Sequence, residues 1–95
     1  MRLSEFQYQS IKKVVADYLT NYELKLFGSR TNDNAKGGDI DLLILTKEKL
    51  KLEEKWAIRR EIEKLIGQQK IDIVNFTFDD VNPFKELILE NAIKL

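Results

Sequence analysis

The segment from Asp39 to Leu45, Asp-Ile-Asp-Leu-Leu-Ile-Leu, combines two carboxylates with an apolar run that has the length of a β-strand. Four consecutive apolar residues after Asp41 are typical of a strand that is buried on both faces. Residues i and i+2 share a face of a strand, so Asp39 and Asp41 should point the same way. Two adjacent carboxylates repel each other, and their burial costs free energy unless a cation lies between them. The segment therefore predicts a central strand that begins at a cation-binding site.

A shorter apolar run ends in Gly28-Ser29-Arg30, and eight residues separate Arg30 from Asp39. The missing side chain of Gly28 lets the backbone approach a phosphate, and the amides of Gly28 and Ser29, with the Ser29 hydroxyl, can donate to phosphate oxygens. Arg30 can add positive charge to a triphosphate, but it can equally pair with an aspartate. Residues 28–38 are rich in Asn, Asp, Gly and Lys, which suits a loop that wraps a ligand. The Gly-Ser turn and the carboxylates together indicate a site for a metal ion and a nucleotide.

A third carboxylate, Asp72, interrupts the apolar stretch of residues 70–76, which predicts another strand. If this strand lies beside residues 39–45, Asp72 joins the aspartate pair. Three carboxylates around two divalent ions are the usual apparatus of phosphoryl or nucleotidyl transfer. Asp72 is also the candidate base for an attacking hydroxyl, because the chain contains no His.

The residue types that are missing narrow the chemistry further. The chain has no Cys and no His, which excludes disulfides, thiolate metal sites and imidazole ligands. A metal ion held by oxygen alone is expected to be Mg²⁺ or Mn²⁺. The 16 basic and 16 acidic residues cancel, so direct binding to nucleic acid is not expected. Because no apolar run reaches the length of a membrane span and no signal peptide is recognised, we expect a cytoplasmic protein without a membrane partner.

The first part of the chain predicts a helix followed by a strand. A chain of 95 residues is long enough for a single core, so residues 1–95 are expected to form one domain. The segment from Ser4 to Gln7 has the form of a capping box and predicts a helix over about residues 5–20. After a turn, residues 23–27 predict the first strand.

Two further helices complete the expected order of elements. Thr46 is expected to cap a helix over about residues 47–66, and one face of this helix is expected to carry Leu52, Trp56, Arg59 and Ile62 or Glu63. Asn82-Pro83 predicts a closing helix that runs to about residue 94, with an apolar stripe that includes Phe84, Leu87, Ile88 and Ala92. The order helix, strand, loop, strand, helix, strand, helix indicates an α/β (α+β) fold, in which helices cover a small mixed sheet of three or more strands.

The motifs are together similar to those of a known protein family. Gly28-Ser29-Arg30, the pair Asp39-X-Asp41 and the later Asp72 resemble the signature of nucleotidyltransferases of the DNA polymerase β superfamily. The size of the chain and its closing Asn-Pro-Phe-Lys-Glu segment make it most similar to the minimal nucleotidyltransferases. The resemblance implies the palm-like fold of that superfamily. It also implies metal ions at the three aspartates and a triphosphate at Gly28 and Ser29.

Minimal nucleotidyltransferases are often the antitoxins of HEPN-domain toxins, and some transfer AMP from ATP to that partner. The resemblance therefore implies a Mg²⁺-dependent enzyme that transfers a nucleoside monophosphate from a nucleoside triphosphate, ATP above all, to a hydroxyl of a HEPN partner. The acceptor is expected from that partner or from a second copy in a homodimer. The alternative is a non-catalytic nucleotide-binding module that neutralises a toxin by direct binding.

Overall fold

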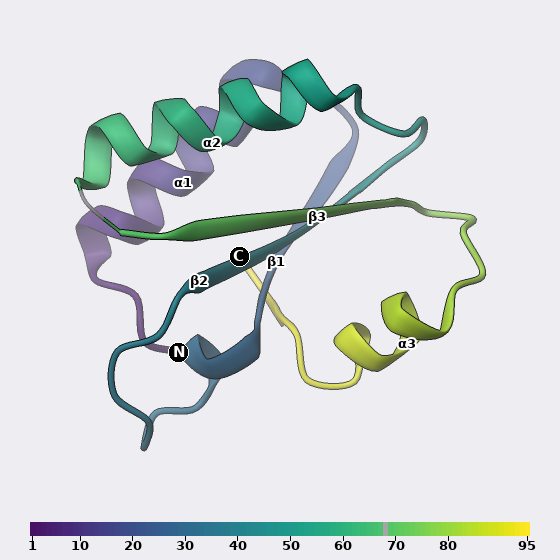
Figure 1. The fold of residues 1–95 in the computed structure, drawn as a ribbon. Helices are drawn as coiled ribbons and strands as arrows, with labels where there is room; N and C mark the ends of the chain where they lie inside the picture. The colour runs from purple at the N-terminus through teal and green to yellow at the C-terminus, as the bar shows by residue number, and fades with distance from the viewer. Residues whose placement is uncertain (68) are drawn as a thin grey trace.

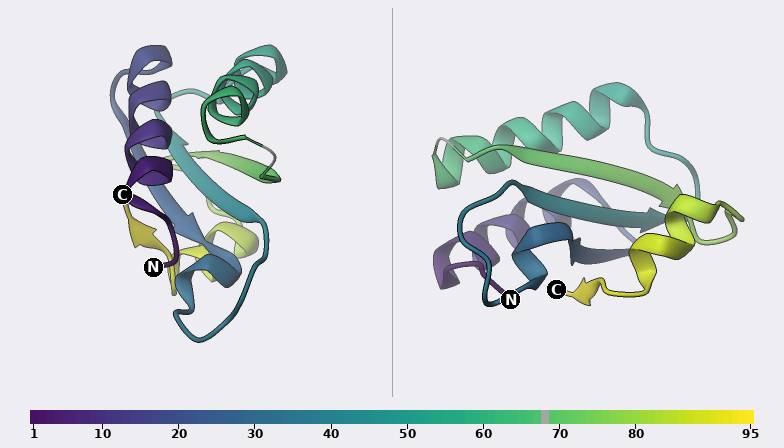
Figure 2. Two further views of the ribbon diagram at one scale, coloured as in Figure 1. Left: turned by 90° about the vertical axis from the view of Figure 1, so that its left-hand side faces the viewer. Right: turned by 60° about the horizontal axis from the view of Figure 1, so that its bottom comes forward.

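The computed structural model describes residues 1–67 and 69–95, which form a four-stranded sheet with helices on both faces. In chain order the elements are α1 (Glu5–Tyr18), β1 (Tyr22–Phe27), the 3₁₀ helix η1 (Gly28–Thr31), β2 (Ile40–Thr46), α2 (Leu52–Ile66), β3 (Ile71–Thr77), α3 (Pro83–Leu89) and β4 (Ile93–Lys94). Helices α1 and α2 lie side by side on one face of the sheet, and the short α3 lies against the other face (Figures 1 and 2). Within the described residues, no helix combines the length and apolar character needed to span a membrane.

The sheet has the strand order β3-β2-β1-β4 and is mixed. Strand β1 is antiparallel to both β2 and β4, whereas β2 is parallel to β3. The register places Asp41 of β2 between Phe27 of β1 and Asp72 of β3. This arrangement confirms the predicted mixed sheet and brings the two aspartate-bearing strands side by side.

Alternate residues of β2 pack into two separate apolar cores. Ile40, Leu42 and Ile44 face α1 and α2, where they join the larger core cluster with residues such as Val15 and Ile62. Leu43 and Leu45 face the other way and pack with Phe76 and Ile88 of β3 and α3. Because β2 is covered on both faces, its near-continuous apolar sequence is explained.

Two of the three predicted helix caps, those at Ser4 and Asn82, form as expected from the sequence. The Ser4 hydroxyl accepts from the Gln7 amide at 3.0 Å, and the Ser4 amide donates to Gln7 Oε1 at 2.9 Å, which forms the capping box of α1. The Asn82 side chain accepts from the Phe84 amide at 2.8 Å, and Pro83 is the first residue of α3. These local signals depend only on neighbouring residues, so the sequence alone could predict them.

The predicted start of α2 is wrong, and on its predicted face Ile62 is buried but Leu52 and Trp56 are not. Thr46 stays in β2, where it pairs with Tyr22 and Thr77, and its hydroxyl donates to the Glu48 carbonyl at 2.6 Å. The helix begins only at Leu52, which is 76% exposed. Its fully buried residues include Ile58, and Trp56, two positions earlier, lies about 200° away around the helix axis and is half exposed.

The predicted closing helix is too long. Helix α3 ends at Leu89, and residues 93–94 form β4 instead of a further helical turn. Strand β4 pairs Ile93 with Leu26, and the Leu95 amide donates to the Leu24 carbonyl at 3.0 Å. Pairing with β4 satisfies backbone groups of β1 that would otherwise be an open sheet edge, and this tertiary interaction overrides the local helical pattern.

Candidate active site

The carboxylates of Asp41 and Asp72 lie on neighbouring parallel strands, where β2 and β3 begin. The two residues are direct partners in the strand register, so their side chains leave the same face of the sheet at the same level. Asp39 precedes β2 by one residue and lies near enough to influence the charge of Asp41. Helix α3 covers this face only farther along the strands, where Leu43 and Phe76 lie, so the carboxylate end is left open.

The charge of this cluster is poorly compensated by the protein itself. Burial raises the pKa of the Asp41 carboxyl, and the neighbouring Asp72 and Asp39 carboxylates raise it further. Lys70 opposes this shift, and its Nζ lies 3.5 Å from Asp39 Oδ2. Both side chains of this ion pair are largely exposed, so the pair contributes little to stability. The cluster therefore has the electrostatic character of a cation-binding site.

The donor atoms suit a hard divalent ion, although the aspartates are not arranged as a finished site. Carboxylate oxygens are the ligands that Mg²⁺ prefers, and Asp41 and Asp72 present them side by side. Across residues 1–67 and 69–95, no three acidic side chains converge closely enough to form a ready metal site. Asp39 contacts Lys70 instead.

Gly28 brings the backbone directly against the Asp41 carboxylate. It follows the last residue of β1 and has a φ of +76°, a left-handed conformation that favours glycine. A Cβ atom at this position would collide with Asp41 Oδ2. Both the backbone conformation and the close approach therefore require a residue without a side chain between the loop and the aspartates.

The loop after Gly28 begins with the 3₁₀ turn η1, which the sequence did not predict. The Thr31 hydroxyl donates to the Gly28 carbonyl at 2.7 Å, and the Asn32 amide donates to the Ser29 carbonyl at 3.1 Å. At the far end of the loop, Gly38 has a φ of +91°, and a Cβ there would collide with Ser29 Oγ. The two ends of the loop therefore pack against each other beside the carboxylates.

Arg30 fastens this loop to distant parts of the chain. Its guanidinium donates to the carbonyls of Gly38 at 3.2 Å and Arg2 at 2.9 Å, and to Gln69 Oε1 at 3.0 Å. Arg2 in turn donates to the carbonyls of Ser29 and Asn32. The structure thus gives Arg30 a positioning role, and a contact between Arg30 and a nucleotide stays a prediction. No sequence signal marks Arg2, because its partners lie about thirty positions away.

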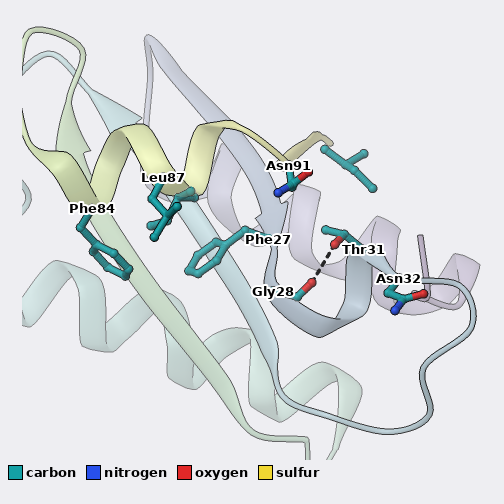
Figure 3. A pocket seen from close by; sticks show the side chains of 9 residues that line it. Phe27, Gly28, Thr31, Asn32, Phe84, Leu87 and Asn91 are labelled. Atoms are coloured by element: carbon teal, nitrogen blue, oxygen red, sulfur yellow. Dashed lines mark hydrogen bonds between the residues drawn. The ribbon is translucent and has the colours of Figure 1, made fainter.

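A pocket opens beside Gly28, between η1 and α3, with a volume of about 470 Å³ (Figure 3). Its lining residues come from β1, η1, α3 and β4 and from the residues that follow η1 and α3: Phe27, Gly28, Thr31, Asn32, Phe84, Leu87, Ile88, Asn91 and Ile93. Phe84 and Leu87 were expected in the apolar stripe of the closing helix, but they are 50% and 62% exposed. The apolar pattern of α3 was visible in the sequence, whereas the pocket depends on how α3 lies relative to η1.

Comparisons with known proteins agree with this fold. The family model described as "Polymerase beta, Nucleotidyltransferase" matches residues 9–95. Among curated proteins, none matches the sequence. Three similar solved structures can be compared. A mutant MntA-HpeT toxin–antitoxin pair shares 15% identity over 90% of this chain and 69% of that chain, with a TM-score of 0.74. A toxin–antitoxin structure with AMP-PNP shares 17% identity over 90% and 69%, also at 0.74.

The third structure is a complex of a tri-AMPylated HEPN toxin from Shewanella oneidensis with its MNT antitoxin. It shares 16% identity over 93% of this chain and 70% of that chain, with a TM-score of 0.68. All three structures thus come from toxin–antitoxin pairs, and at these identities the likeness to this chain is one of fold. The family model, by contrast, spans nearly the whole sequence, including the Gly-Ser turn and all three aspartates. The chain belongs to the polymerase β nucleotidyltransferase family.

Proposed function

We propose that this protein is a Mg²⁺-dependent nucleotidyltransferase that transfers AMP from ATP to a hydroxyl group of a HEPN-domain partner, as the antitoxin of a toxin–antitoxin pair. The observation that carries the proposal is the register pair of Asp41 and Asp72, which places two carboxylates side by side next to Gly28. Two of the similar structures support the choice of substrates, since one contains AMP-PNP and another contains a tri-AMPylated HEPN toxin with its antitoxin.

In this proposal Asp39, Asp41 and Asp72 hold the divalent ions, and Mn²⁺ can replace Mg²⁺. Asp39 completes the set by exchanging its exposed ion pair with Lys70 for the metal, which costs little because that pair is solvated. Bound divalent ions would neutralise phosphate oxygens and lower the pKa of the attacking hydroxyl. The raised pKa of Asp41 supports this assignment, because a cation would relieve the repulsion that raises it.

The other site residues position the phosphates and the acceptor. The amides of Gly28 and Ser29, with the Ser29 hydroxyl, donate to phosphate oxygens, and Arg30 holds the loop that carries them. Asp72 accepts the proton of the acceptor hydroxyl. The acceptor oxygen then bonds to the α-phosphorus, the bond from the α-phosphorus to the oxygen that bridges it to the β-phosphorus breaks, and pyrophosphate leaves with the electron pair.

Transfer of a radioactive label tests the proposal directly. The chain is incubated with Mg²⁺, the product of the neighbouring gene as the partner and ATP labelled at the α-phosphate. We expect label on the partner, and none when the label is on the γ-phosphate. The double variant Asp39→Ala with Asp41→Ala should lower transfer by roughly a thousandfold, because metal ions supply several kcal/mol of transition-state stabilisation.

The control is Asp79→Ala, which removes an exposed aspartate from the turn after β3. Absence of label from the partner, or transfer unchanged in the double variant, would contradict the proposal.

One observation favours the alternative of a non-catalytic binding module. Among the residues that the structure describes, the three aspartates do not converge as a finished metal site, and Asp39 contacts Lys70. If the protein neutralises its toxin by binding alone, the double alanine variant should still protect cells that express the toxin. A folded double variant that binds the partner but no longer protects would refute this alternative.

A further inference from the structure

The proposed function assigns metal ions to the aspartates and phosphates to the Gly-Ser turn, but it gives no ligand to the pocket between η1 and α3. Its volume of about 470 Å³ lies within the range of small-molecule sites, roughly 300–1,000 Å³. Its lining is mainly apolar and includes Phe27 of β1 and Phe84 and Leu87 of α3 (Figure 3). Thr31 and Asn91 add polar groups. Leu87 is 62% exposed on α3, so a ligand in the pocket would cover an apolar side chain that the fold leaves in solvent.

The pocket and the expected acceptor site lie toward opposite edges of the sheet. In the strand order β3-β2-β1-β4, the carboxylates come from β2 and β3, whereas the pocket is lined by residues of β1 and β4. Gly28 belongs to both regions, since it lines the pocket and lies against the Asp41 carboxylate. A nucleotide with its phosphates at Gly28 can therefore extend into the pocket, while Asp72 remains accessible from the β3 side.

The side chains of the pocket suit a flat heteroaromatic ring. The Phe84 ring meets Phe76 edge-on, with ring centroids 6.3 Å apart and an interplanar angle of 72°, which fixes its orientation. The half-buried Phe27 is held in the sheet register opposite Asp41. Nucleobases stack on aromatic side chains in proteins, and an asparagine amide such as that of Asn91 can pair with both N6 and N7 of adenine.

We infer that this pocket binds the nucleobase of the nucleoside triphosphate, with adenine as the preferred base. The inference rests on the proposed function, because it needs the triphosphate at Gly28 and Ser29. It adds the residues that recognise the nucleoside, with Phe84 and Phe27 as stacking surfaces and Asn91 as the group that reads the base. The triphosphate site alone would not distinguish one nucleotide from another.

Calorimetric titration of the full chain with two ligands in Mg²⁺ tests the inference. ATP carries the base, and inorganic tripolyphosphate has the same phosphate chain without it. We expect Phe84→Ala to weaken ATP binding roughly tenfold and to leave tripolyphosphate binding unchanged, because a lost stacking surface affects only the base. Phe84→Trp keeps an aromatic ring and should retain ATP binding. The matched control is Phe6→Ala, which removes a similarly exposed phenylalanine from α1, and circular dichroism checks that each variant is folded.

The outcomes separate failure of the inference from failure of the proposed function. If the wild type binds ATP no more tightly than tripolyphosphate, or if a folded Phe84→Ala variant binds ATP normally, the nucleobase assignment is overturned and the proposed function stands. If that variant binds ATP normally but no longer transfers AMP, the pocket holds the acceptor side chain instead. If the wild type binds neither ligand, both proposals fall. Asn91→Ala should reduce the preference for ATP over GTP, and an unchanged preference overturns the choice of adenine.

Discussion

The two faces of the sheet are built from alternate residues of the same strands, yet they serve different purposes. The face under α1 and α2 is closed: Leu26, Ile40, Leu42 and Ile44 have no exposed surface there. The opposite face is closed only where Leu43 and Leu45 pack with Phe76 and Ile88. Its other end carries Asp41 and Asp72 and opens into the pocket beside Gly28.

This difference shows how a small domain can hold an unfavourable site. The carboxylate cluster destabilises its own end of the sheet, since burial and mutual repulsion oppose the ionisation of Asp41. The closed face supplies the apolar burial that keeps the strands in register despite that repulsion. A change on the closed face should therefore mainly alter stability, whereas a change on the open face should mainly alter ligand binding.

The largest effect on stability is expected for Leu42→Ala on the closed face. Leu42 is fully buried, so the substitution loses apolar contacts and leaves a cavity, which costs about 3 kcal/mol of unfolding free energy. For a domain of this size the melting temperature should fall by roughly 10–20 °C. Urea unfolding measures the loss, and Leu52→Ala is the control, because Leu52 is 76% exposed and its replacement should cost less than about 0.5 kcal/mol. Equal losses for the two variants would contradict the distinction between closed and exposed apolar positions.

A smaller loss of stability, with a separate loss of function, is expected for Gly28→Ala. Both Gly28 and Gly37 have positive φ angles, so alanine at either position should cost about 1–2 kcal/mol. Of these two glycines, Gly28 alone would bring the new Cβ against a side chain, and the Asp41 carboxylate would have to turn away to accommodate it. We therefore expect Gly28→Ala, but not Gly37→Ala, to abolish the rise in melting temperature that Mg²⁺ and ATP give the wild type. A Gly28→Ala variant that Mg²⁺ and ATP stabilise as well as the wild type would show that Asp41 needs no fixed orientation.

The sequence predicted those parts of the fold that depend on local pattern. The apolar run after Asp41 identified β2, and the capping residues Ser4 and Asn82 marked the starts of α1 and α3. It also predicted that Asp72 would meet Asp41 if their strands were neighbours, and the register of β2 and β3 meets that condition. The metal, nucleotide and partner roles of these residues stay predictions.

The parts that could not be predicted depend on contacts between distant segments. Strand β4 forms because β1 offers an open edge some seventy residues earlier in the chain. The Arg30 side chain donates hydrogen bonds to the Arg2 carbonyl and to Gln69 Oε1, and no local sequence pattern connects these residues. The exposure of Trp56 and Phe84 follows from how α2 and α3 lie on the sheet. Their apolar character and helical spacing were therefore not enough to predict that they are buried.

The smallest effect, and one of opposite sign, is expected for Asp41→Asn in the absence of divalent ions. The pKa of Asp41 is raised in the folded protein above the usual value of 3.8, by burial, by Asp72 and by Asp39, against the opposing influence of Lys70. A raised pKa means that the folded state binds this proton more tightly than the unfolded state does. The stabilisation by the protonated form is therefore complete below about pH 3.8 and is lost as the pH rises through the folded-state pKa.

Asparagine cannot ionise, so Asp41→Asn should be more stable than the wild type at pH 7 by about 0.5 kcal/mol after solvent screening, or roughly 2–4 °C in melting temperature. Thermal melts with a chelator between pH 3.5 and pH 7.5 should show this difference shrinking to nothing as the pH falls. Adding Mg²⁺ at pH 7 should reverse the order, because only the wild type keeps all three carboxylates. Asp79→Asn, in the exposed turn after β3, is the control and should show no such pH dependence. A metal-free Asp41→Asn variant that is less stable than the wild type at pH 7 would show that Asp41 supports the fold, so that the open face would stabilise the protein as the closed face does.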